Sequence, residues 1–190
     1  MKKEHAYLLM GISFLIGIGL GVVITVLHEE RLGLPTVSRM AEFSPEMIPQ
    51  ELNEKISALE ALVEKDPKNL QALIELGNLY FDLGRVESAI DRYSTVLAIQ
   101  PENADVRTDR GILYRRKGEI ERAIADFKKA AQDDPRHINS RYNLGVILLH
   151  DKGDLKGAIE AWEDYLKVNP HSPRAENIRI QLSKMKVMAK

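Results

Sequence analysis

The sequence predicts an all-α protein, in which a stack of helical hairpins follows one membrane-spanning helix. Residues 6–27 contain no Asp, Glu, Lys or Arg, and from residue 67 onward proline, glycine and aromatic residues recur at intervals of 34 or 35. The 190 residues include no cysteine and carry a net charge of −1. Disulfides, cysteine-ligated metals and thiol catalysis are therefore excluded, and no overall charge favours nucleic-acid binding.

Residues 8–27 are almost entirely apolar, and about 20 helical residues of this kind cross a bilayer. Lys2 and Lys3 precede this segment. By the positive-inside rule they place residues 1–7 in the cytoplasm and the rest of the chain on the periplasmic face of a bacterial inner membrane. A cleaved signal peptide and a buried soluble helix are the alternatives. The run is long for a signal peptide, and no small-residue cleavage site follows it.

Small residues recur every four positions within this apolar segment, a spacing that lets membrane helices pack closely. They are Ser13, Gly17, Gly21 and Thr25. The stripe predicts packing with a second membrane helix, from a homodimer partner or from another protein. Residues 28–48 lack sustained periodicity and contain glycine and proline, so we expect a linker.

The rest of the chain is repetitive. The prolines are Pro67, Pro101, Pro135 and, one residue later than the 34-residue period, Pro170. The same register holds for Gly77, Gly111 and Gly145, for Gly84, Gly118 and Gly153, for Ala89, Ala123 and Ala158, and for Tyr93, Phe127 and Trp162. This pattern predicts that each unit forms two helices joined by a turn that contains glycine, and that proline ends the second helix. The extra residue lies between Gly145 and Gly153. We expect the first glycine series to let helices approach, and the aromatics to fill the space between stacked hairpins.

These units resemble the tetratricopeptide repeat (TPR) in the strings LGNLYFDLGRVESAIDRYSTVLAIQP, RGILYRRKGEIERAIADFKKAAQDDP and LGVILLHDKGDLKGAIEAWEDYLKVNP. The resemblance covers residues 70–170 and implies a right-handed superhelical α-solenoid. Arg110 departs from the pattern, because leucine stands at the matching positions 76 and 144. The predicted parts are a leading half-repeat helix at 49–66, repeats at 70–103, 104–137 and 138–171, and a capping helix at 172–190.

The TPR resemblance implies a concave groove that binds protein segments and is lined by the first helix of each repeat. Asn78 and Asn143 are the strongest candidates, because asparagine is a mediocre helix former whose amide can bond a peptide backbone. Each residue could instead be an ordinary exposed side chain. The expected lining is Ile74, Asn78, Phe81, Asp82, Asp105, Thr108, Asp109, Ile112, Arg115, Arg116, Asn139, Tyr142, Asn143, Val146 and His150.

Two arginines fall on a helix face that is usually apolar. Arg107 and Arg110 must find partners there, because an unpaired buried charge is costly. Asp91 and Asp126 are the expected partners in a structural pair. A charged floor of the groove is the alternative.

No pattern of catalytic residues is present: no two histidines have ligand spacing on one helix, and no glycine-rich phosphate loop occurs. We therefore predict no enzyme activity, cofactor or metal. The predicted function is that of a membrane-anchored adaptor that binds protein partners and assembles or localises a complex. One alternative is a self-assembling scaffold. The other is presentation of apocytochrome to a haem lyase, since ISALEALVEKDPKNLQALIELGNLYFDLGR and AIEAWEDYLKVNPHSPRAENI resemble the periplasmic TPR module of cytochrome c maturation complexes.

Overall fold

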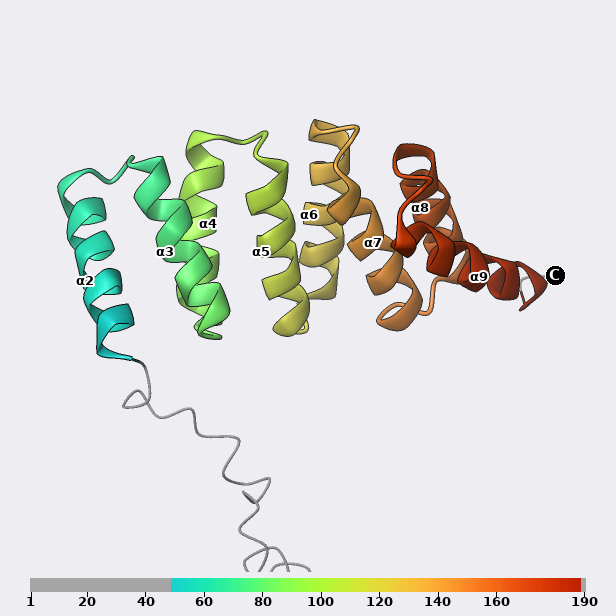
Figure 1. Ribbon diagram of the computed structural model, residues 1–190, viewed down its shortest axis with the longest axis horizontal. Coiled ribbons are helices and arrows are strands. Elements are labelled where there is room, and N and C mark those ends of the chain that lie inside the picture. The colour runs from blue at the N-terminus through green and yellow to red at the C-terminus, as the bar shows by residue number, and fades with distance from the viewer. Residues whose placement is uncertain (1–48, 189–190) are drawn as a thin grey trace, which may run out of the picture. The chain divides into compact units, whose positions relative to one another are not determined.

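The computed structural model describes residues 49–188. In this part of the chain every regular element is an α-helix, and successive helices pack side by side in a row from α2 to α9 (Figure 1). The prediction of an all-α, solenoid-like stack is confirmed. The helices are α2 (Gln50–Lys65), α3 (Leu70–Asp82), α4 (Val86–Ile99), α5 (Ala104–Arg116), α6 (Ile120–Asp133), α7 (Ile138–His150), α8 (Leu155–Val168) and α9 (Pro173–Met188).

The recurring prolines occupy equivalent turns, each between the second helix of one hairpin and the helix that follows. Two residues after each proline, a side chain accepts a hydrogen bond from a backbone N–H in the first turn of the next helix. Proline prevents continuation of the preceding helix, and the cap pairs an N–H that would otherwise lack a partner. The caps are Asn69, Asn103, His137 and Ser172, which bond to the N–H of Ala72, Val106, Ser140 and Ala175.

Inside each hairpin, a glycine of the first helix packs against an aromatic ring of the second. A Cβ atom added to the glycine would lie only 2.2–2.7 Å from the nearest ring atom, so no larger residue fits without displacing the ring. The aromatic rings therefore pack against the glycine of their own hairpin, and not only between neighbouring hairpins as the sequence suggested. The pairs are Gly77 with Tyr93, Gly111 with Phe127, and Gly145 with Trp162.

The turn inside each hairpin contains a glycine in the left-handed region, with φ of 68° at Gly84, 75° at Gly118 and 66° at Gly153. Residues with a Cβ rarely adopt this conformation. The third turn spans residues 151–154, whereas the first spans 83–85. The extra residue of the third repeat lies in this turn, as the spacing predicted.

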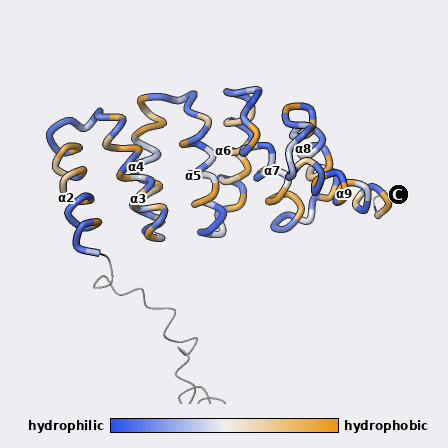
Figure 2. Tube along the Cα trace, viewed as in Figure 1, coloured by the Kyte–Doolittle hydropathy of each residue, from blue (hydrophilic) through white to orange (hydrophobic). Residues whose placement is uncertain are grey.

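The hydrophobic core consists of two clusters of buried residues, one spanning α2 to α5 and the other α5 to α9. Hydrophobic and hydrophilic residues alternate along the helices (Figure 2), as expected when each helix buries one stripe. Ile56 and Leu59 of α2 and Ile178 of α9 cover the two ends of the stack. Leu62 of α2 is 49% exposed. Each large apolar side chain that is fully buried contributes about 1.5–3 kcal/mol.

The localisation predicted from the sequence needs correction. No helix among residues 49–188 is long and apolar enough to cross a membrane; the longest have 16 residues and an exposed polar face, whereas a bilayer requires about 20 apolar residues. The periplasmic, inner-membrane location is therefore wrong by this finding. The predicted N-terminus (1–7), anchor (8–27), linker (28–48) and stripe of Ser13, Gly17, Gly21 and Thr25 lie outside the described residues.

Candidate functional site

A depression opens between α5, α7 and the first turn of α9. Its volume is about 230 Å³. Apart from His137 and Arg174, every residue that lines it belongs to the predicted groove. The lining consists of Asp105, Thr108, Asp109, Ile112, His137, Asn139, Tyr142, Asn143 and Arg174.

Helical spacing explains why these side chains gather. Residues 105, 108, 109 and 112 of α5 follow the i, i+3, i+4, i+7 pattern of a single helix face, and residues 139, 142 and 143 of α7 do the same. Because α5 contacts α7 directly, the two faces lie side by side. The depression therefore combines residues that are about 34 positions apart in the sequence.

The Asp109 carboxyl is the most perturbed acid of the depression. Its pKa is raised to about 6 from the ordinary value of 3.8. Burial is the largest cause, the Asp105 and Asp82 carboxylates also raise the pKa, and the His137 imidazole lowers it. Among residues 49–188 the Asp109 carboxylate has no ion pair and no hydrogen bond. The Asp109 carboxylate therefore has no direct partner within the described residues.

Two further polar groups lie in the same wall. Thr108 is 3% exposed, and its Oγ1 has no hydrogen-bond partner in the part of the chain that the structure describes. The Nδ1 atom of His137 accepts from the backbone N–H of Ser140, which leaves Nε2 as the protonated nitrogen. Nε2 lies 3.0 Å from Oδ1 of Asp105, so His137 donates to this carboxylate and joins α7 to α5.

Tyr142 and Arg174 form the rim on the side of α9. The Arg174 guanidinium lies over the Tyr142 ring, 4.5 Å from its centroid, and the ring of Tyr165 meets Tyr142 edge-on at 6.2 Å. A cation over an aromatic face is attracted by the ring quadrupole. Within the described residues, Arg174 forms no ion pair with Asp105 or Asp109.

The predicted groove residues of α3 lie outside this depression. Ile74 and Phe81 are half-buried and pack against the core, and Asp82 is exposed. The Oδ1 atom of Asn78 accepts a hydrogen bond of 2.8 Å from the Tyr93 hydroxyl. Asn78 therefore has a structural reason to be on this helix, which its low helix propensity alone did not indicate.

Four other predicted groove residues also lie outside the depression. Arg115 of α5 pairs with Asp151 at 2.8 Å, and the guanidinium of Arg116 lies over the Phe81 ring, 4.3 Å from its centroid. Val146 is half-buried against the core, and the exposed His150 ends α7. These side chains connect hairpins or end a helix.

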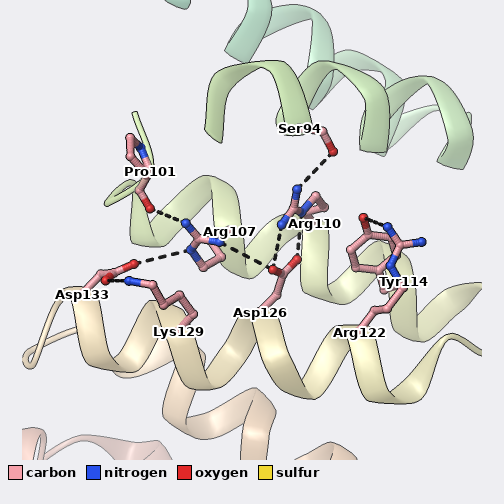
Figure 3. Close-up of polar contacts among 9 residues, drawn as sticks. All are labelled: Ser94, Pro101, Arg107, Arg110, Tyr114, Arg122, Asp126, Lys129 and Asp133. Atoms are coloured by element: carbon pink, nitrogen blue, oxygen red, sulfur yellow. Dashed lines mark hydrogen bonds and ion pairs between the residues drawn. The ribbon is translucent and has the colours of Figure 1, made fainter. Parts of the chain in front are cut away.

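The two arginines at apolar positions form a structural network with α6 (Figure 3). Arg110 donates to both carboxylate oxygens of Asp126, each at 2.8 Å, and to the Ser94 hydroxyl at 3.1 Å. Arg107 lies 3.7 Å from Asp126 and 3.5 Å from Asp133. Asp126 is therefore confirmed as a partner.

The prediction that Asp91 is the other partner is wrong, because the Asp91 carboxylate lies 3.1 Å from Arg92. Asp91 is exposed on α4, whereas Asp126 lies on the α6 face that packs against α5. The network occupies that α5–α6 contact, so Arg107 and Arg110 do not form a groove floor.

His137 and Arg174 are the lining residues that the sequence analysis did not select. His137 follows a proline turn, and only its position as the N-cap, equivalent to Asn69 and Asn103, could have indicated that it points toward the preceding repeat. Arg174 is one of several charges in the last helix, and no local signal distinguishes it. No group of three His, Cys, Asp or Glu residues within 49–188 could hold a metal ion.

Comparisons with known proteins agree with the helical repeats. A TPR repeat model matches residues 77–116, and a tetratricopeptide repeat model matches residues 108–173. Among curated proteins, none matches the sequence.

Solved structures share the fold. A tetratricopeptide repeat protein from Parabacteroides merdae ATCC 43184 is 26% identical, with a TM-score of 0.63 over 71% of this chain and 54% of its own. A crystal structure of MamA is 23% identical, with a TM-score of 0.62 over 70% of this chain and 84% of its own. MamA 41-end from Desulfovibrio magneticus RS-1 is 20% identical, with a TM-score of 0.59 over 65% and 69%. At these identities the MamA structures show the fold alone.

Proposed function

The chain carries tetratricopeptide repeats, and from this premise we propose that it is an adaptor that holds a segment of a partner protein across α5 and α7. Such repeats generally act as non-enzymatic scaffolds for protein–protein interaction. The observation that carries the proposal is the depression, in which side chains from two repeats and the last helix face one another.

The chemistry of this face suits a polypeptide. The amides of Asn139 and Asn143 can each donate to and accept from a peptide backbone. Ile112 and Tyr142 offer apolar surface beside them, and tyrosine is enriched at protein interfaces because it combines a large ring with a polar end. The partner would therefore be bound by its backbone and by a few side chains.

Photo-crosslinking tests this proposal. A photo-reactive amino acid replaces Asn143 in the full chain, and a control chain carries it at Lys128, which is exposed on α6. We expect a crosslinked partner segment from position 143 and little from position 128. Equal crosslinking at the two positions would mean that the binding face lies elsewhere.

Affinity for the crosslinked segment gives the second measurement. The double variant Asn139→Ala/Asn143→Ala should weaken binding roughly tenfold, about 1.4 kcal/mol, with little change in the thermal unfolding temperature. The matched variant Lys128→Ala should bind as the unchanged chain does. Calorimetry with a synthetic peptide of the crosslinked segment checks both.

Two narrower roles remain predictions that the same crosslinks address. If the chain serves cytochrome c maturation, the partner should be an apocytochrome segment. If it is a self-assembling scaffold, position 143 should crosslink to a second copy of the chain.

A further inference from the structure

We propose that the depression between α5, α7 and α9 is a pocket for one cationic side chain, a lysine or an arginine, of the bound partner. This inference rests on the proposed function and names the chemistry of its recognition element. It is argued from the charge of the pocket, an unpaired hydroxyl in its wall, its size and its rim.

Negative charge is the first argument. Asp105 and Asp109 lie one turn apart on α5 and both line the pocket, and the Asp82 carboxylate is close enough to repel Asp109. Asp105 accepts a hydrogen bond from His137, whereas Asp109 has no partner among residues 49–188. A cation from outside would compensate both carboxylates with charge-assisted hydrogen bonds.

The Thr108 hydroxyl is the second argument, and it does not depend on the acidic pair. Buried hydroxyls nearly always have a hydrogen-bond partner, yet Oγ1 of Thr108 has none among the described residues, although the residue is 3% exposed and lines the pocket. An ammonium or guanidinium group donates several N–H bonds. Because Oγ1 has less than 1 Å² of accessible surface, the hydroxyl must turn toward the pocket for one of these N–H groups to reach it, while the others reach the carboxylates.

Size and shape favour a single side chain. The volume of about 230 Å³ is below the roughly 300–1,000 Å³ of sites that enclose a whole small molecule. Ile112 and the Tyr142 ring provide apolar surface for a methylene stem. Since residues 49–188 contain no group of three metal-ligating side chains, a bare metal ion fits this pocket poorly.

The rim already holds a cation. Arg174 stacks on Tyr142 at 4.5 Å without pairing to either aspartate, which shows that a guanidinium fits against this ring. Its charge would repel an incoming cation. Arg174 is therefore expected to lower the affinity of the pocket, and its removal should raise it.

A titration followed by NMR on the full chain tests the pocket. The probes are N-acetyl-arginine methylamide, N-acetyl-lysine methylamide and, as a neutral mimic of arginine, N-acetyl-citrulline methylamide. We expect saturable shifts of the backbone amides of Thr108, Asp109 and Asn143 with both cations at millimolar concentration. The citrulline probe should bind at least about fivefold more weakly, because it lacks the charge.

Matched variants assign the binding to these residues. Asp109→Asn should weaken both cationic probes about fivefold or more, whereas Asp91→Asn, which removes an exposed carboxylate on α4, should not. Thr108→Val should weaken them by a smaller factor. Arg174→Gln should tighten binding about twofold to threefold, and Lys184→Gln, also on α9, should leave it unchanged. The NMR spectrum of each variant shows whether it is folded.

Three results would overturn the inference: equal binding of citrulline and arginine, shifts that map outside the depression, or an Asp109→Asn variant that binds as the unchanged chain does. In each case crosslinks from position 143 would still support the adaptor, so the two failures are distinguishable. If instead the partner crosslinks at position 128, the adaptor face is wrong and the inference fails with it.

Discussion

The second and third hairpins share one register but hold their helices together differently. In the third, Leu144 of α7 and the buried Ala161 of α8 form an apolar contact region. In the second, the matching positions are Arg110 and Asp126, which form a bidentate ion pair. The comparison shows that a repeat tolerates a buried charge when the facing residue carries the opposite charge. The ion pair then compensates for the hydration that each charged group loses on burial.

The two faces of α5 extend this comparison. Toward α6, Arg110 meets Asp126, and both are mostly buried, with 17% and 8% of their side chains exposed. Toward α7, Asp109 has no cationic partner among residues 49–188. One face therefore uses charge for cohesion, whereas the other leaves a carboxylate without a direct partner among the described residues.

Removing one member of the ion pair should have the largest effect. Asp126→Ala leaves the Arg110 guanidinium buried without its carboxylate and should cost about 3–5 kcal/mol. Arg110→Leu/Asp126→Ala recreates the pair of the third hairpin and should be neutral or stabilising by about 1–4 kcal/mol. Urea unfolding measures both free energies. A double variant as unstable as Asp126→Ala would contradict the explanation that the cost comes from the arginine left without its carboxylate.

The free-energy cost of replacing the packed glycine should differ between the same two hairpins. A Cβ at Gly145 would lie 2.2 Å from Nε1 of Trp162, which donates to the backbone oxygen of Tyr142. Since the indole cannot move without losing this bond, Gly145→Ala should cost about 3 kcal/mol, and Gly111→Ala, which meets the Phe127 ring, about 1 kcal/mol. Thermal unfolding followed by the fluorescence of the single tryptophan compares them, and equal costs would contradict this explanation.

The unpaired Asp109 predicts a pH effect. Its pKa of about 6 is above the ordinary value of 3.8, so the folded chain binds this proton more tightly than the unfolded chain does. Asp109 therefore destabilises the fold at pH 7, and the cost falls as the pH drops through 6 and disappears below the ordinary value of 3.8. Asp109→Asn should be more stable than the unchanged chain by roughly 1–2 kcal/mol at pH 7 and about equally stable near pH 3.

The cation pocket should follow the same titration. At pH 5 the protonated Asp109 attracts a cation less, so the arginine probe should bind more weakly than at pH 7.5. The charged and titratable groups around this carboxyl are Asp82, Tyr93, Asp105, His137 and Arg174. In the Asp109→Asn variant the difference between the two pH values should shrink. If the Asp109→Asn variant keeps the same pH dependence of binding, another of these groups is responsible for that dependence.

The exposed ion pair between the hairpins should matter least. Arg115 and Asp151 lie 2.8 Å apart with 36% and 24% of their side chains exposed. Pairs of this kind contribute about 0–1 kcal/mol. Asp151→Asn should therefore change the free energy of unfolding by less than about 1 kcal/mol, and a cost near that of Asp126→Ala would contradict the distinction between exposed and buried pairs.

Local rules let the sequence by itself determine the helices, their turns and the register of the repeats. Proline fixes its own φ, glycine admits a positive φ, and a cap pairs with an N–H three residues away, so each signal acts within one turn. The same periodicity brought residues 105, 108, 109 and 112 onto one face. These are the features of the fold that the structure bears out.

Only the tertiary structure decided which polar groups are paired and which are free to bind. Nothing near Asn78 indicated that Tyr93 would donate to it, and nothing near Arg174 indicated that it would cover Tyr142. The expected Asp91 partner and the membrane location were likewise not settled by residue type. The physical reason is that a charge or hydrogen bond depends on distances between helices, which the packing of the whole stack determines and which local sequence does not encode.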